Sequence, residues 1–504
     1  MSPTTTAAAM TMKTNELIEK DRKYLWHPFT QMRDWQTDEV LVIEKGDGCY
    51  LIDTEGRRYL DGVSSLWCNV HGHCVEAIDK AVKKQLGKIA HSTFLGLTHP
   101  TAIELAEKLI AIAPGNRPDM SFPRRRESRP GSPIETFGDD RKREKAWDSN
   151  VCGQAGNDGQ RLSRVFYSDS GSEAMEIALK MAFQYWAQTG KPGKKRFAKL
   201  TNAYHGDTIG SVSLGGIDLF HQIYQPLLFE TFAVPSPYTY RWPSGGNPGQ
   251  VMEESLKAME KVFQEHHKEI AALIMEPLMQ GAAGMIDQPR GYISRAWQLT
   301  EKYNILLIFD EVATGFGRTG KMFAAEHENV TPDIMAVAKG LTGGYLPLAA
   351  TLTTEKVYEA FLGKYEEFKT FFHGHTFTAN PLACAAAVAN LRLFEKQKTI
   401  EKLQAKINFL KNRLQDFYAL SCVGDIRQVG MMIGIELVRD KRTREMFLPE
   451  EKIGVRVIEK ARKKGAILRP LGSVIVLMPP LAMTLKQLSR LCDITYQSIK
   501  EVTE

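Results

Sequence analysis

The sequence of 504 residues has no closely paired cysteines and no long apolar run. Its seven cysteines are scattered without a CxxC pair, which argues against a disulfide framework and favours reduced thiols in a cytoplasmic protein. No apolar run approaches the roughly 18 residues that a membrane helix needs, so we expect no membrane partner. No GxGxxG motif follows an early strand, which argues against a dehydrogenase.

The chain as a whole has no large excess of charge of one sign, and two of its segments lack a regular periodicity of apolar residues. The net charge is only +6, and much of the basicity lies in residues 117–160, which are rich in Pro, Gly and Arg. We predict that this segment is a disordered insertion. A basic docking segment is the alternative, but acidic residues interleave with the arginines, which also argues against nucleic-acid binding. Residues 1–15 lack signal-peptide and transit-peptide features, and we predict a disordered tail.

Two apolar runs end in residues suited to catalysis. Ile305–Phe309 is followed by Asp310, and Ile334–Ala338 is followed by Lys339 and a glycine-rich turn. Since strand-like runs alternate with helical stretches here, we expect a mostly parallel α/β sheet, whose ligands bind at the carboxyl ends of the strands. A lysine able to form a Schiff base and an aspartate for a ring nitrogen are the minimal equipment for pyridoxal phosphate. Taken singly, a surface lysine and a loop aspartate remain the alternative.

Other short motifs fit the same ligand. Ser170, Gly171 and Ser172 open a predicted helix, where free backbone N–H groups can bind a phosphate, although an ordinary helix cap is the alternative. Tyr204 follows a predicted strand and could stack on a flat ring, unless it is a core tyrosine. Val312 could pack on the opposite face of that ring. Together these motifs favour a binding site for a phosphorylated heterocycle over an ordinary protein surface.

Three further polar features are less specific. His373 and His375 could form a metal pair, but no companion ligands lie at suitable spacing, so we expect no metal site. Arg469 stands at a strand end beside Pro470 and is a candidate carboxylate clamp, with a surface arginine as the alternative. Glu276 follows another predicted strand and could supply a buried polar contact.

Together these motifs resemble those of the class III aminotransferases, which are pyridoxal phosphate enzymes of fold type I. The signature extends from Leu306 to Gly340, and the resemblance covers nearly the whole chain outside residues 1–15 and 117–160. It implies an α/β fold, in which a large domain with a mostly parallel, seven-stranded sheet carries the cofactor. A smaller α+β domain is expected from both chain ends, with residues 16–70 and 376–504 flanking the large domain of residues 71–375.

The resemblance also implies roles for individual residues. Lys339, Asp310 and Tyr204 would be catalytic, and Thr376 would reach the phosphate of the partner subunit's cofactor, since the family forms its site between two subunits of a homodimer. The implied cofactor-binding residues are Gly171, Ser172, Tyr204, Asp310, Val312, Lys339, His375 and Thr376. The implied substrate-binding residues are Phe29, Leu66, Trp67, Tyr204, Lys339, Gly374 and Arg469.

The N-terminal stretch Leu25–Met32 is similar to a motif of the family branch that acts in biotin biosynthesis. This implies transfer of an amino group to 8-amino-7-oxononanoate, which gives 7,8-diaminononanoate. Members that use S-adenosylmethionine as the donor typically carry two adjacent tryptophans where this chain has Leu66 and Trp67, and a frequent tyrosine is Phe29 here. The donor is therefore expected to be S-adenosylmethionine or lysine. Another transaminase of ω-amino acids or diamines is the alternative, and the intact motifs argue against a non-catalytic protein of this fold.

Overall fold

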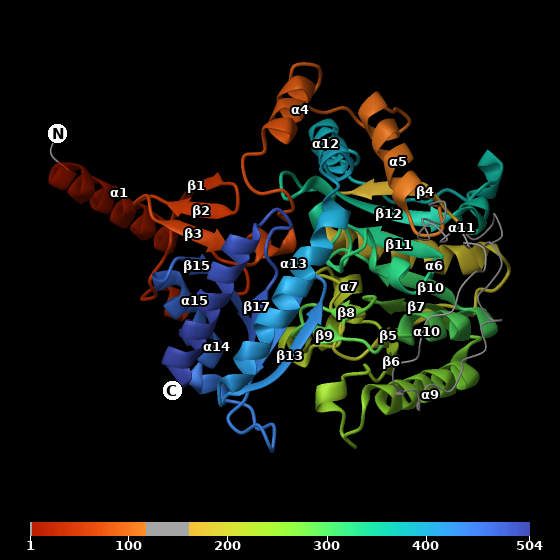
Figure 1. Cartoon of the computed structure of the whole chain (residues 1–504). Coiled ribbons are helices and arrows are strands. Elements are labelled where there is room, and N and C mark those ends of the chain that lie inside the picture. Colours follow the sequence, from red (N-terminus) through yellow and green to blue (C-terminus); the bar gives the residue numbers. More distant parts are fainter. Residues whose placement is uncertain (1–2, 117–160) are drawn as a thin grey trace, which may run out of the picture.

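A mostly parallel sheet of seven strands forms the centre of the computed structural model, which describes residues 3–116 and 161–504 (Figure 1). β12 alone runs antiparallel to its two neighbours in this sheet, which confirms the predicted architecture. The predicted insertion at 117–160 lies outside the described residues. In spatial order the strands are β4 (Leu162–Ser168), β12 (Ala349–Thr354), β11 (Ile334–Val337), β10 (Leu306–Asp310), β7 (Ile270–Met275), β5 (Arg196–Leu200) and β6 (Thr231–Val234).

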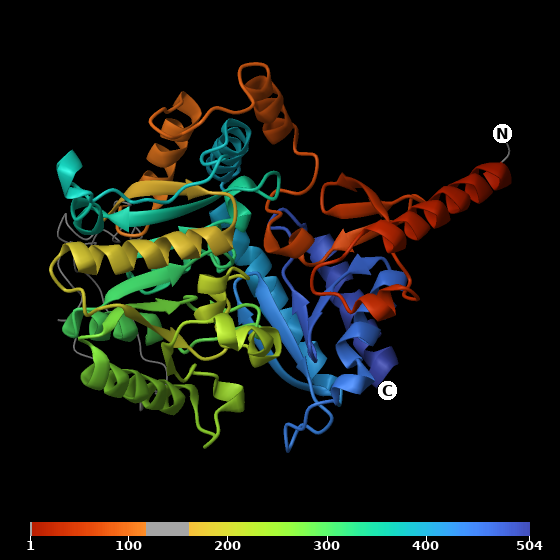
Figure 2. The same cartoon turned by 180° about the vertical axis from the view of Figure 1, so that it is seen from behind.

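Both faces of this sheet are covered, which explains why its central strands β7, β10 and β11 are largely apolar and fully buried. Leu306 and Ile308 pack with the residues of α6 (Gly171–Gln188), which lies across one face (Figure 2). Leu307 and Phe309 point to the other face and join a core that includes residues of α9 (Pro248–His266) and α10 (Tyr292–Lys302). The alternation of side chains along a strand therefore divides the core into two layers.

Helices from distant parts of the chain complete the fold. α12 packs on α4 and α5, so segments on either side of the large sheet's sequence meet near its β4 edge. The remaining longer helices are α1 (Pro3–Tyr24), α4 (Glu76–Leu86), α5 (Pro100–Ile112), α12 (Pro381–Gln397), α13 (Thr399–Leu414), α14 (Ile453–Lys463) and α15 (Leu485–Thr503). The short helices are α2 (Met32–Trp35), α3 (Ser64–Trp67), α7 (Ile209–Ser213), α8 (Asp218–His221) and α11 (Glu355–Glu359).

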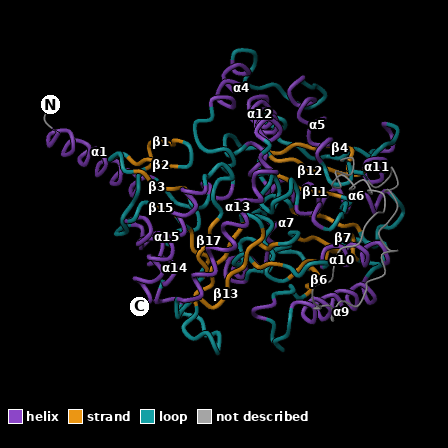
Figure 3. The backbone as a smooth tube through the Cα atoms, viewed as in Figure 1, coloured by secondary structure: helices purple, strands orange, loops and turns teal. Residues whose placement is uncertain are grey.

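Two smaller four-stranded sheets accompany the large one, and the first of them joins the two chain ends (Figure 3). In the first, the N-terminal strands pair with a C-terminal strand, since Leu60 is in register with Ala466. This arrangement agrees with a small domain drawn from both ends, while its exact boundaries stay predictions. The strands of these sheets and of one short hairpin are β1 (Ile43–Asp47), β2 (Tyr50–Asp53), β3 (Arg58–Asp61) and β15 (Ala466–Ile467); β13 (Val423–Val429), β14 (Met432–Leu437), β17 (Val474–Leu477) and β16 (Arg469–Leu471); and β8 (Met279–Gln280) with β9 (Ile286–Asp287).

Residues 3–15, which were predicted to belong to a disordered tail, lie in α1. This helix projects from the body of the molecule (Figures 1 and 2). The physical reason is its alanine content, because alanine has the highest helix propensity and residues 7–9 are all alanine. Among the described residues, no helix is long and apolar enough to cross a membrane.

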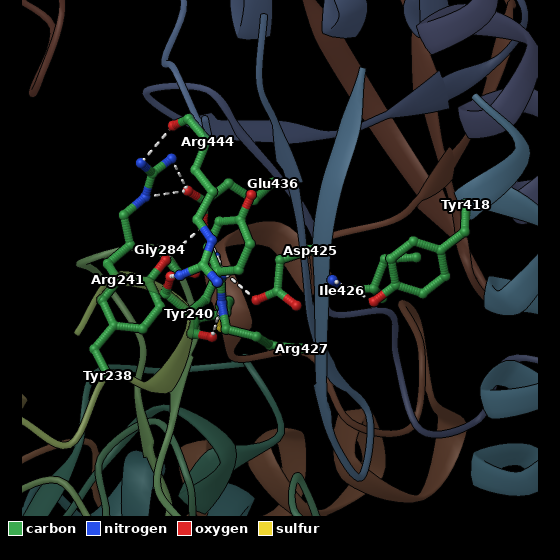
Figure 4. Close-up of polar contacts among 11 residues, drawn as sticks. Tyr238, Tyr240, Arg241, Gly284, Tyr418, Asp425, Ile426, Arg427, Glu436 and Arg444 are labelled. Atoms are coloured by element: carbon green, nitrogen blue, oxygen red, sulfur yellow. Dashed lines mark hydrogen bonds and ion pairs between the residues drawn. The ribbon is translucent and has the colours of Figure 1, made fainter. Parts of the chain in front are cut away.

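A buried ionic network fastens the β13–β14 sheet to the loops of the large sheet (Figure 4). Arg427 donates to Asp425 at 2.7 Å and to Glu436 at 2.5 Å, and its other nitrogens donate to the carbonyls of Gly284 and Met285. Glu436 also accepts from Arg241. Burial opposes ionisation of Glu436, but these partners outweigh it and lower the pKa of this carboxyl. The network therefore sets where the turn between β8 and β9 lies.

Candidate active site

The strand ends bring the predicted residues to one cavity of about 400 Å³. Asp310 ends β10, Lys339 follows β11, and Tyr204 follows β5, and because these three strands run parallel in the sheet, they deliver the residues to the same edge. The structure therefore confirms the predicted meeting of an acid and a lysine at this edge. The predicted site residues that line the cavity are Trp67, Gly171, Ser172, Tyr204, Asp310, Val312 and Lys339.

Lys339 begins the short 3-10 helix η6 (Lys339–Thr342) with a φ of +41°, a left-handed conformation that is uncommon for lysine. Its Nζ lies 5.5 Å from the centroid of the Trp67 indole. Burial lowers the pKa of the amine, although the charges of Asp310 and Glu276 partly oppose this effect. A lysine that loses its proton more readily than usual is suited to act as a nucleophile and a proton carrier.

Asp310 is fixed by two contacts before any ligand binds. One carboxylate oxygen lies 2.7 Å from His205 Nδ1, and the other accepts the backbone N–H of Val312 at 3.0 Å. His205 is buried, and its Nε2 has no partner among the described residues. This role of His205 was not predicted from the sequence. The signal that could have found it is its position beside Tyr204, after a strand two places from β10 in the sheet.

The first turn of α6 has the shape of an anion cradle. Ser170 caps the helix in a reciprocal capping box with Glu173, which satisfies the backbone N–H groups of these two residues. The N–H groups of Gly171 and Ser172 in the same turn have no partner within an α-helix and can bind a ligand. A Cβ at position 171 would lie 2.7 Å from Val312 Cγ1, and one at position 206 would lie 2.0 Å from Ser172 Oγ. Gly171 and Gly206 therefore keep this turn open for a group that carries negative charge.

Glu276 adds a second buried carboxyl to the cavity wall. It accepts the backbone N–H of Tyr204 at 3.1 Å and that of Gly281 at 2.9 Å. Burial raises its pKa to about 7, and the nearby Asp310 charge acts in the same direction, against His205. Near neutral pH Glu276 can therefore be protonated, while it still holds two loops of the site together.

The floor of the cavity near Lys339 comes from an unusual backbone turn. Ser64, Ser65, Leu66 and Trp67 have φ values of +53°, +48°, +72° and +72° in succession, so the short helix α3 is left-handed. This conformation costs roughly 1–2 kcal/mol for each residue other than glycine. The run of four strained residues explains why Trp67 is buried while its neighbour Leu66 is about half exposed.

The remaining predicted residues lie around this cavity rather than in its wall. Phe29 is exposed, and its ring contacts Phe220 edge-on at 5.6 Å, which in turn lies 6.4 Å from the ring of Tyr204. Arg469 is half-buried, and its Nε has no partner among the described residues. Burial lowers the pKa of Arg469, and the charge of Tyr204 partly opposes this effect. The roles of Phe29, Leu66 and Arg469 stay predictions.

The predicted loop around Gly374 lies outside the cavity lining of this chain. Gly374 and Thr376 are exposed, and a Cβ at position 374 would meet no atom within 4 Å. His375 lies 3.4 Å from Asp169 and 3.9 Å from Glu173. Ligand atoms of these three residues lie within 4.8 Å of one another. The absence of a metal site stays a prediction.

These residues fit pyridoxal phosphate. The glycine cradle at the start of α6 has room for the phosphate, the fixed carboxylate of Asp310 can meet a ring nitrogen, and the amine of Lys339 can bind the aldehyde. Tyr204 and Val312 both line the space between these groups. Six of the predicted cofactor-binding residues therefore line one cavity, while His375 and Thr376 do not: the six are Gly171, Ser172, Tyr204, Asp310, Val312 and Lys339.

Comparison with known proteins agrees with this chemistry. The pattern of the family "Aminotransferase class-III" matches residues 32–124 and 142–499. The adenosylmethionine-8-amino-7-oxononanoate aminotransferase of Anoxybacillus flavithermus is 51% identical over 97% of this chain and 98% of that relative. The crystal structure of the protein of the same name from Methanocaldococcus jannaschii is 42% identical, with a TM-score of 0.84 over 97% of this chain and 99% of that one.

An omega transaminase from Pseudomonas jessenii, solved in complex with PMP, also gives a TM-score of 0.84, at 30% identity over 97% of this chain and 98% of its own. The fold is thus shared by several transaminases. The residues that the family pattern matches include all those that line the cavity. By its sequence, its sheet and its lysine-bearing site, the chain belongs to the class-III aminotransferases and is a pyridoxal phosphate-dependent aminotransferase.

Proposed function

We propose that this chain transfers an amino group to 8-amino-7-oxononanoate and produces 7,8-diaminononanoate in biotin biosynthesis, with pyridoxal phosphate as its cofactor. The observation that carries the proposal is sequence identity along the whole length. Relatives named for this reaction are 51% and 49% identical over 97% of the chain, while omega transaminases of equal structural similarity are about 30% identical. Since a shared fold does not fix the substrate, this difference favours the biotin reaction.

Lys339 and Asp310 would perform the central steps of this reaction. When bound, pyridoxal phosphate delocalises the electrons left at the substrate Cα after its proton is removed. Asp310, held by His205, would keep a positive charge on the ring nitrogen through a charge-assisted hydrogen bond. Lys339 would anchor the aldehyde and then, once released by the incoming amine, move the proton at the substrate Cα, a task that its lowered pKa supports.

Residues at the cavity mouth would bind the substrate. Arg469 has a buried Nε without a partner among the described residues, so a carboxylate could satisfy its guanidinium. Phe29 reaches toward Tyr204 through the ring of Phe220, which extends an aromatic wall outward from the cavity. Leu66 would leave one side of the donor position without an aromatic plane, so the proposal includes both S-adenosylmethionine and lysine as donors.

We also propose a homodimer whose partner completes the site. Gly374 and Thr376 are exposed and do not line the cavity of their own chain, which suits a role toward a second copy. A cytoplasmic location without nucleic-acid or membrane partners belongs to the same proposal. It is supported by the free state of the six described cysteines, Cys49, Cys68, Cys74, Cys384, Cys422 and Cys492.

A half-reaction on purified protein loaded with pyridoxal phosphate tests the proposal. S-adenosylmethionine and lysine are added separately while the absorbance of the bound cofactor is followed. We expect one donor to bleach the absorbance and 8-amino-7-oxononanoate to restore it. The proposal is overturned if neither donor bleaches the cofactor, or if an ω-amino acid or diamine acts while 8-amino-7-oxononanoate restores nothing.

A further inference from the structure

The left-handed turn of α3 has the hydrogen bonds of a complete helical turn. The Trp67 N–H donates to the Val63 carbonyl at 2.7 Å, and the Cys68 N–H donates to the Ser64 carbonyl at 3.1 Å. None of its four residues is glycine, so nothing in their intrinsic preference favours this conformation. A strained segment of this kind persists only where its surroundings hold it. The contacts that hold it therefore determine where Trp67 lies.

Asp61 supplies the contacts on one side of the turn. Its Oδ1 accepts the backbone N–H of Ser65 at 2.8 Å, and its Oδ2 accepts the Ser65 hydroxyl at 2.8 Å. The same Oδ2 lies 3.1 Å from His73 Nε2. Asp61 is fully buried, at the end of β3, and does not line the cavity. The Asp61 carboxylate therefore fixes the position of Ser65 without itself lining the cavity.

Arg318 and Ser64 hold the other side. The buried guanidinium of Arg318 donates to the carbonyls of Trp67 at 3.3 Å and Asn69 at 2.8 Å, and also to Pro479. The Ser64 hydroxyl donates to the carbonyl of Met478 at 2.6 Å. Since both sides of the turn are bound, a loss on the Asp61 side leaves Trp67 attached to the protein but free to shift.

The side chain that the turn delivers is in contact with the reacting end of the site. The Trp67 indole lies beneath the Lys339 amine, and a Cβ at position 281 would lie 3.3 Å from indole Cζ3, so the ring also packs on the backbone of Gly281. Gly281 in turn donates to Glu276. A shift of the turn would therefore move the indole relative to Lys339 and to the backbone of Gly281, which binds Glu276.

We propose that Asp61 is a positioning residue, which holds the left-handed turn and thereby keeps the Trp67 indole in place against Lys339. The inference rests on the proposed function, because it is Lys339 that carries the reaction. Asp61 itself touches neither the cavity nor the lysine, so its effect on turnover passes through Trp67.

The experiment compares variants of the holoenzyme labelled with 5-fluorotryptophan. The chain has seven tryptophans, and the Trp67→Phe variant identifies the fluorine NMR signal of residue 67. In Asp61→Ala we expect this signal to move or split and kcat/KM for the acceptor to fall about 10- to 100-fold, as a misplaced cavity wall predicts. Asp53→Asn is the matched control, because Asp53 is also a buried carboxylate of the N-terminal sheet but holds a hairpin turn remote from the cavity.

Replacing Ser65 gives a rescue that a general loss of stability would not show. Glycine adopts a positive φ without a steric penalty, whereas alanine does not, and both remove the Ser65 hydroxyl. In the Asp61→Ala background we expect Ser65→Gly to restore part of kcat/KM and to narrow the Trp67 signal, and Ser65→Ala to restore neither. Should Asp61→Ala fail to fold, Asp61→Asn is measured in the same way, and a smaller loss in the same direction is expected.

The proposal is overturned if both Asp61 variants leave the Trp67 signal and kcat/KM as in wild type, if Asp53→Asn moves the Trp67 signal equally, or if alanine at position 65 rescues as well as glycine. The Trp67 signal is recorded without substrate. If wild type does not use 8-amino-7-oxononanoate, the proposed function fails, while the comparison of the Trp67 signals still decides the role of Asp61.

Discussion

Lys339 has a buried amine and follows β11. Its replacement should remove the catalytic amine while the fold is kept. We expect Lys339→Ala to lower turnover by at least the roughly 10²- to 10⁴-fold that loss of a proton carrier causes, while the fold is kept. Steady-state rates and circular dichroism measure the two effects. Lys194→Met is the control, because Lys194 is also a buried lysine with a lowered pKa but binds backbone carbonyls far from the cavity. Full activity of Lys339→Ala would remove Lys339 from the mechanism.

Gly171 illustrates how a missing side chain can make a site. In Gly171→Ala the new methyl group would meet Val312 at about 2.7 Å, so we expect weaker retention of pyridoxal phosphate. The double variant with Val312→Ala should bind the cofactor more tightly than Gly171→Ala alone, because it removes the clash. Titration of cofactor absorbance measures both affinities, with Val312→Ala as the single-variant control. If Gly171→Ala and wild type bind pyridoxal phosphate with equal affinity, the Val312 side chain moves aside without weakening cofactor binding, which contradicts the prediction.

Glu276 predicts a dependence of stability on pH. Its pKa is raised from 4.5 to about 7, so the folded chain keeps a proton that the unfolded chain has lost between these values. The free energy of unfolding should therefore fall as the pH rises through this window, by on the order of 3 kcal/mol from this group. Glu276→Gln should reduce the slope of the melting temperature against pH. Glu366→Gln, at an exposed position, should leave the slope unchanged. Equal slopes in all three proteins would contradict the raised pKa.

Among the secondary-structure elements, β13 and β14 are fastened to the large sheet's loops by Arg427. Removing one partner of a buried ion pair typically costs about 3–5 kcal/mol, so Arg427→Ala should lower the free energy of unfolding by that amount. Denaturant unfolding measures it. Arg442→Ala is the control, since that side chain is 91% exposed and should change stability by less than about 0.5 kcal/mol. A similar small effect of Arg427→Ala would show that the network contributes little.

The elements also show what a sequence can predict. Asp310 and Lys339 were predictable because each follows a short buried strand, and a strand's end fixes which edge of the sheet its next residue reaches. The contact of His205 with Asp310 was not, because it joins strands that are distant in the sequence. The left-handed turn of Ser64–Trp67 was not predictable either, since it contains no glycine and is held by contacts with other parts of the chain, among them Asp61, Arg318 and Met478.

For the molecule as a whole, the proposed dimer predicts that two variants that are each inactive alone recover activity when their subunits are mixed. If Thr376 acts at the partner's site, Lys339→Ala and Thr376→Ala subunits each lack activity alone but form hybrids with one intact site. Mixing the two after dissociation should restore roughly a quarter of wild-type activity, because half of the dimers are hybrids. Mixing Lys339→Ala with Asp310→Ala is the control and should restore nothing. The absence of recovery in the first mixture would place Thr376 in its own chain's site.

The order of the large sheet has a consequence for synthesis. β4 is its first strand along the chain, and its neighbour in the sheet is β12, the last. During translation β4 therefore has no partner in this sheet until residues 349–354 have left the ribosome. The first turn of α6, which follows β4 directly, is fixed only then. Asp310 and Lys339 are thus already made when the phosphate cradle takes its place, so a nascent chain can bind the cofactor only once the whole sheet has been translated.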